Sequence, residues 1–223
     1  MITMTELQPD LSFYYGIHRG QRRDTARYVE ALQSLQVKDH VRRRALSKWA
    51  IGFGHELVAH HTIEDTVVFP DLARRVPATQ AILDRLEGDH VRVHHLLEEL
   101  NSTARGLVGL GFVEARERAI AVAIELRDLL QVHLDVEDEQ ILTVFVEQYS
   151  VEEYEALDAK CIKALPKKGI AFSVPWNISN FDEQTRAELL PTAPMPLRAV
   201  YRLTHRRYER LVEEAFGEVP APV

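Results

Sequence analysis

The sequence predicts an all-α fold, namely an antiparallel up-down four-helix bundle with a C-terminal helical extension. Apolar residues recur at helical spacing from the N-terminus to Leu165, with few of the alternating β-branched patterns typical of strands. Helix-breaking prolines are rare in that part, because only Pro9, Pro70 and Pro77 precede Pro166, the first of the seven that follow. The 223 residues, 46% of them hydrophobic and 27% charged, suffice for one domain with an extension.

Helix breakers and capping residues divide this first part of the chain. Asp10 is a possible N-cap of the first helix, Pro70 is expected to stop the second, and Gly106 is expected at the C-cap of the third. The four long helices are predicted at 10–35, 38–69, 78–104 and 113–149. A shorter fifth helix begins at Ser150, where Ser-Val-Glu-Glu forms a capping box, and ends before Pro166.

Prolines dominate the rest of the chain. We expect 166–196, which contains Pro175-Trp176 and Phe181, to form an irregular strap over the bundle. An amphipathic helix is predicted at 197–216, and its arginine-rich face is expected to be solvated. The expected division is therefore a bundle with a short fifth helix in 1–165, and a strap and terminal helix packing on it in 166–223.

Composition excludes several classes of protein. With 34 acidic and 27 basic residues, the net charge is −7, and the basic surface that nucleic acids require is missing. The lone Cys161 allows neither an intrachain disulfide nor a cysteine-based zinc site. The N-terminus lacks a signal-peptide pattern, and no stretch approaches the ~18 apolar residues of a membrane span. These features predict a cytoplasmic protein without a nucleic-acid or membrane partner.

The ten histidines are the most unusual feature of the composition. Each of the four long helices carries at least one in a pattern typical of metal ligands. The candidate ligands are His18 on the first helix, His60 and Glu64 on the second, His90 and His94 on the third, and His133 and Glu137 on the fourth. The i, i+4 spacing stacks each pair on one helix face. Because glutamates among apolar core positions need a compensating cation, the pattern predicts a buried metal centre.

An internal repeat indicates two metal ions rather than one. The separation in sequence from His60 to His133 equals that from Glu64 to Glu137, and the separation from His18 to His90 is shorter by a single position. The first two predicted helices and the next two therefore form related hairpins. Facing hairpins bring both ligand sets to one pseudo-twofold centre, as in other bundle-core metal sites.

Ligand counting predicts an open coordination position. Two iron-like ions take about six ligands each. Five histidines, two bridging glutamates and an oxo or hydroxo bridge fill all but one of these positions. The open position is expected on the ion held by His18 and His60, because Arg22 stands where the third helix has His94. An ion held by His90, His94 and His133 is saturated in this scheme.

These residues resemble the hemerythrin family, specifically the bacterial hemerythrin-like HHE cation-binding domains. The pattern is a histidine, HxxxE, HxxxH and a histidine followed by a carboxylate, in order on four helices, and the resemblance covers residues 10–150. It implies a hemerythrin-like bundle with two non-haem iron ions that meets dioxygen, hydrogen peroxide or nitric oxide. The Pro-Trp segment and the arginine- and tyrosine-rich last helix resemble actinobacterial and mycobacterial members.

Some assignments stay open. Asp138 is an alternative to Glu137, although Glu137 matches the repeat better, and His61 is an alternative to His60 that we place in the outer shell. Tyr14 lies one turn before His18, as a core residue, a hydrogen-bond donor or a ligand. The other histidines, His40, His55, His95 and His205, are expected at the surface or behind the ligands.

The predicted function is that of a redox enzyme, catalase-like or peroxidase-like, or of a scavenger of nitric oxide. A reversible carrier or sensor of oxygen or nitric oxide is the first alternative. Iron storage or a structural metal site is the second alternative. A closed structural zinc site is not favoured, because it needs only four ligands. The sequence does not indicate the redox partner.

Overall fold

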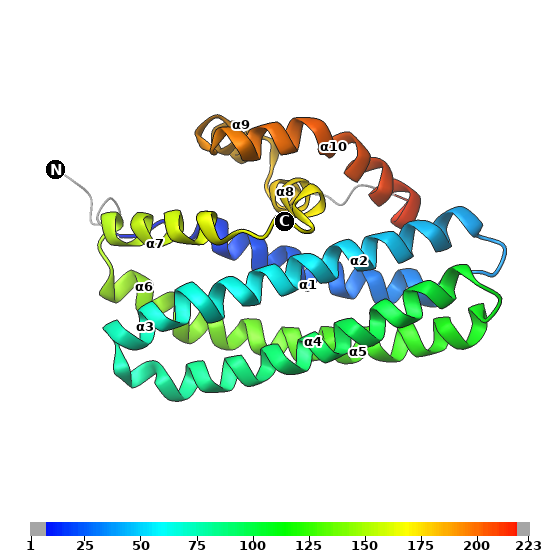
Figure 1. Cartoon of the computed structure of the whole chain (residues 1–223), viewed down its shortest axis with the longest axis horizontal. Helices are drawn as coiled ribbons and strands as arrows, with labels where there is room; N and C mark the ends of the chain where they lie inside the picture. Colours follow the sequence, from blue (N-terminus) through cyan, green and yellow to red (C-terminus); the bar gives the residue numbers. More distant parts are fainter. Residues whose placement is uncertain (1–7, 218–223) are drawn as a thin grey trace.

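The computed structural model describes residues 8–217, which form an all-α structure, so the predicted fold class is confirmed. Figure 1 shows four long helices side by side, with consecutive helices running in opposite directions. These are α1 (Ser12–Gln33), α2 (His40–Ile63), α4 (Gln80–Val108) and α5 (Phe112–Val136). No helix in the described part of the chain is both long enough and apolar enough to cross a membrane.

The apolar core lies between these helices, but they do not pack equally. α4 packs closely on α5 and α2, and α1 packs on α5, whereas α1 and α2 contact each other little. Trp49, Leu32 and Leu126 are among the buried residues of this core. The α1–α2 side of the bundle therefore needs another element to cover it.

Both α2 and α5 continue through a short π-helical turn. The turn η2 (Glu64–Val68) leads from α2 into α3 (Phe69–Arg75), and η4 (Glu137–Ile141) leads from α5 into α6 (Leu142–Gln148). The prediction that Pro70 stops the helix was wrong. Pro70 lies in the first turn of α3, where a missing N–H is tolerated, so the chain stays helical to Arg75.

Two predicted helix caps were also wrong. Gly106 lies inside α4, and the C-cap of this helix is Gly109. The glycine at 106 allows close packing against α5, since a Cβ at this position would lie 2.6 Å from the Cβ of Ala115. The N-cap of α1 is Leu11, and the Asp10 carboxylate accepts the Ser12 N–H at 2.9 Å. A short 3-10 turn, η3 (Pro77–Thr79), precedes α4.

The fifth helix, α7 (Val151–Ala164), begins at the predicted capping box. The Ser150 hydroxyl accepts the Glu153 N–H, and the Glu153 carboxylate accepts the Ser150 N–H. α7 packs on η2, at the end of the bundle where α3 and α6 also lie (Figure 1).

The C-terminal extension is helical rather than irregular. It contains α8 (Ile170–Ser179), α9 (Glu183–Thr192) and α10 (Met195–Phe216), and α8 and α10 pack on α2 (Figure 1). Pro196 lies in the first turn of α10, where proline is tolerated, and Pro191 lies inside α9, next to its last residue. Pro175 lies inside α8, beside the fully buried Trp176. Burial of Trp176 holds α8 in place despite the proline.

Candidate metal centre

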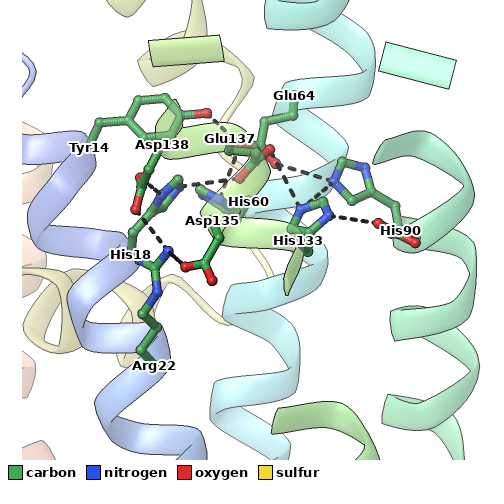
Figure 2. A network of polar contacts seen from close by, with 11 residues as sticks. Tyr14, His18, Arg22, His60, Glu64, His90, His133, Asp135, Glu137 and Asp138 are labelled. Carbon is green, nitrogen blue, oxygen red and sulfur yellow. Dashed lines mark hydrogen bonds and ion pairs between the residues drawn. The ribbon is translucent and has the colours of Figure 1, made fainter. Parts of the chain in front are cut away.

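The predicted ligand residues meet inside the bundle, between α1, α2, α4 and α5 (Figure 2). In each of two groups, the candidate ligand atoms lie within 4.8 Å of one another. We name the first group, His18, His60, Glu64 and Glu137, group 1, and the second, His61, His90 and His133, group 2. Six of the seven predicted ligands lie in these groups, and His94 does not.

Each glutamate of group 1 also lies close to a histidine of group 2. Glu64 lies 3.1 Å from Nε2 of His60 in group 1 and 3.6 Å from Nε2 of His90 in group 2. Glu137 lies 3.4 Å from Nε2 of His18 in group 1 and 3.6 Å from Nε2 of His133 in group 2. Each carboxylate thus has one oxygen on each side, which is the arrangement of a bridging ligand.

The backbone at both glutamates explains how each neighbouring aspartate also faces inward. The π-helical turns begin at Glu64 and at Glu137. A π-helical turn is wider than an α-helical turn and is frequent at functional sites. In both turns the glutamate points to the centre, and the following residue, Asp65 or Asp138, contacts the far side of a histidine ring.

Carboxylates lie beside the outer nitrogens of three histidine rings, and two of these contacts, those to His18 and His90, are within hydrogen-bond distance. Asp138 lies 2.7 Å from Nδ1 of His18 and Asp65 lies 2.6 Å from Nδ1 of His90. Asp89 lies 3.6 Å from Nδ1 of His133. Such outer contacts fix the ring orientation and leave Nε2 free for a metal. This geometry places Asp138 behind His18 and Glu137 in the centre.

Arg22, which takes the position equivalent to His94 in the repeat, supports this outer layer. Its guanidinium lies 2.8 Å from the carboxylates of both Asp135 and Asp138 (Figure 2).

The structure differs from the sequence expectation at His61 and His94. His61, expected in the outer shell, is fully buried and stacks on His90, with ring centroids 4.1 Å apart. His94, expected as a ligand, lies outside both groups and is partly exposed, while its Nε2 is buried and has no partner within residues 8–217. The reason is that two consecutive residues of α2 point about 100° apart. His60 therefore faces His18 on α1, while His61 faces His90 on α4. The adjacent His-His pair was the signal in the sequence.

Burial makes this cluster unfavourable to charge without a cation. It raises the pKa of Glu64 to about 7 and raises the pKa of Glu137 well above its usual value. It lowers the pKa of His60 and His61 well below the usual value, and lowers the pKa of His133 to about 3.

Several candidate ligand atoms also lack hydrogen-bond partners within residues 8–217. They are Nε2 of His18, His60 and His94, both ring nitrogens of His61, Oε2 of Glu64 and both carboxylate oxygens of Glu137. Buried polar atoms are normally paired, so this many converging unpaired atoms fit a bound metal. Imidazole nitrogen with carboxylate oxygen suits iron among other transition metals.

Tyr14 lies at the edge of group 1. Its hydroxyl donates a hydrogen bond to Oε1 of Glu64 at 2.5 Å, and its ring lies 4.8 Å from that of His18 and 6.0 Å from that of His60 (Figure 2). The side chain expected near the metal on sequence grounds therefore contacts a candidate ligand directly.

Four antiparallel helices around buried imidazoles and glutamates define a helical metal-binding protein. The chain matches the family model described as hemerythrin HHE cation binding domain over residues 11–145, and it belongs to that family. It is accordingly a cation-binding protein, and iron is the cation typical of the family. No curated protein and no solved structure gives a significant match. The matched residues end before α7, so the extension lies outside the family domain.

Proposed function

We propose that the centre holds two non-haem iron ions with an oxo or hydroxo bridge. The histidines of group 1, His18 and His60, would hold the first ion. Those of group 2, His61, His90 and His133, would hold the second, with His61 taking the place expected for His94. Glu64 and Glu137 would bridge the ions, which is supported by their distances to both groups.

We further propose that this centre reacts with hydrogen peroxide, dioxygen or nitric oxide, as a catalase-like or peroxidase-like enzyme or as a nitric-oxide scavenger. The observation that carries the proposal is the unequal number of histidines, two in group 1 and three in group 2. The first ion therefore keeps an open position for a small ligand. A pair of iron ions supplies the electrons that such ligands exchange.

The surrounding side chains have separate roles in this proposal. Tyr14 holds a proton beside group 1, on the hydroxyl that donates to Glu64. Asp138 fixes the His18 ring through Nδ1. Phe69, with its ring 5.6 Å from that of His90, and Phe145, 6.4 Å from Tyr14, belong to the apolar surroundings that exclude water.

The test is oxygen evolution from hydrogen peroxide by purified, iron-loaded protein with a measured metal content. We expect two irons per chain and activity well above that of free iron at the same concentration. Metal-free protein and Glu64→Ala are the controls, and both should be inactive. Activity equal to that of free iron would refute the proposed enzyme.

A reversible carrier or sensor of oxygen or nitric oxide is the competing proposal, because the same open position and the same Tyr14 donor suit a stable adduct. Exposure of the reduced protein to oxygen distinguishes the two. A reversible spectral change with little peroxide turnover favours the carrier. Iron storage predicts many irons per chain instead of two.

A further inference from the structure

The two halves of the centre share their ligands but differ one helical turn to either side of the first histidine. In the internal repeat, His18 corresponds to His90. One turn before them, Tyr14 corresponds to Leu86, and one turn after them, Gln21 corresponds to Val93. Group 1 is thus flanked by two polar side chains where group 2 is flanked by two aliphatic ones.

Gln21 is fully buried, and neither its amide nitrogen nor its amide oxygen has a hydrogen-bond partner among residues 8–217. On α1 it follows His18 at the i, i+3 spacing, which puts the two Cβ atoms about 5–6 Å apart. Buried amide groups are normally paired, and an unpaired one lowers stability. A small molecule that hydrogen-bonds to the Gln21 amide would explain why a polar side chain is buried at this position.

The level of the bundle that Gln21 occupies is otherwise apolar. Adjacent helices run in opposite directions, so one level of the bundle lies after the histidine on two helices and before it on the other two. The level of Gln21 holds the residues three positions after His18 and His90 and three positions before His60 and His133. The other residues at this level are Leu57, Val93 and Leu130, all fully buried. Gln21 is therefore the polar member of a level whose other three positions are aliphatic, one helical turn from the level of the candidate ligands.

We propose that Gln21 is a specificity-determining residue, whose amide hydrogen-bonds a small exogenous ligand on the His18–His60 side. The inference rests on the proposed function, since it needs an open position on that side. The amide N–H suits a ligand with an acceptor atom, and the amide oxygen suits a protonated ligand such as hydrogen peroxide. Tyr14 and Gln21 would then bracket the ligand from opposite ends of the group.

Azide binding to the iron-loaded, oxidised protein tests this role, with absorption spectroscopy as the readout. The variants are Gln21→Leu and Gln21→Met, which remove the amide and keep a similar volume. Thr25→Val is the matched control, because Thr25 lies one turn further along α1 and its hydroxyl is bonded to the Gln21 carbonyl at 2.8 Å. We expect about ten-fold weaker azide binding in both Gln21 variants and unchanged binding in the control.

Each other outcome has a definite meaning. Equal azide affinity in the Gln21 variants and the unmodified protein overturns the inference, and so does an equal loss in Thr25→Val. If the unmodified protein holds two irons and binds no azide, the proposed open position fails first, and the inference fails with it.

A second readout uses metal-free protein and is independent of reactivity. Replacing an unpaired buried amide by leucine should raise the melting temperature by about 2–8 °C. A lower melting temperature in both Gln21 variants would show that the amide is paired within the fold, which also overturns the inference.

Discussion

His61→Leu tests the assignment of His61 to the centre. In the repeat, His61 corresponds to Leu134, which is also fully buried, so the bundle already accommodates leucine at the equivalent level of the other half. The matched variant is His94→Leu, a change of the same kind at the histidine that the sequence suggested. Only the first variant removes a member of group 2.

His61→Leu is expected to stabilise the metal-free protein but to weaken iron binding by the loaded protein. In metal-free protein, leucine removes two buried ring nitrogens that lack partners in the described chain, which should stabilise the fold by about 1–3 kcal/mol. That change raises the melting temperature by about 2–4 °C per kcal/mol in a chain of this size. In iron-loaded protein, the loss of one of three imidazoles should weaken the binding of the second ion. The expected loss of affinity is larger than the ~100-fold that is typical of changes behind the ligands.

The assay is iron content after desalting, followed by thermal unfolding with and without iron. We expect one iron in His61→Leu, two in His94→Leu, and a smaller stabilisation by iron in the first variant. The reasoning is refuted if His94→Leu loses an ion while His61→Leu keeps both.

Three further predictions concern the layers around the centre. Asp138→Asn should weaken iron binding about 10–100-fold in a chelator competition, because the carboxylate holds the His18 ring, whereas Asp135→Asn should have little effect. Trp176→Ala should destabilise the protein by about 3–5 kcal/mol in denaturant unfolding, since the side chain is fully buried, and a loss below about 1 kcal/mol would contradict the role of α8 as a cover. Burial raises the pKa of Glu56, so the folded protein keeps a proton that the unfolded chain loses, and stability falls as the pH rises above about 4.3. Glu56→Gln should therefore raise the melting temperature of metal-free protein at pH 7 but not at pH 4, and an equal effect at both pH values would contradict this.

The ligand level of the bundle could be predicted from the sequence because helical spacing fixes which residues share a face. Three histidine–carboxylate or histidine–histidine pairs at i, i+4 and the internal repeat sufficed to predict six residues that lie in the two groups. On sequence grounds His61 is weighed only against His60, and helical spacing could not show that His61 lies beside His90. That contact depends on which helices lie beside α2, and periodicity within one helix carries no information on its neighbours.

The C-terminal extension was harder to predict, because the effect of its prolines depends on the surface of α1 and α2 on which it packs. α1 and α2 present glycines where the extension packs closely: a Cβ on Gly20 would lie 2.4 Å from Asn180, and one on Gly52 would lie 2.3 Å from Phe172. The indole N–H of Trp176 also donates to the buried Asp24 at 2.8 Å. These long-range contacts stabilise a helix around Pro175 that local propensity disfavours.

The pseudo-twofold repeat distinguishes side chains that both halves of the centre share from side chains that only one half has. Paired positions repeat faithfully: each half has a glutamate close to histidines of both groups and an aspartate behind a histidine. The halves do differ at His61 and Leu134, at Tyr14 and Leu86, and at Gln21 and Val93. In the proposed two-iron centre, His61 would give the second ion a third imidazole, whereas Tyr14 and Gln21 lie on α1, the helix that carries His18. If the proposed function holds, these departures from symmetry favour the His18–His60 side of the centre as the place where a small ligand would bind.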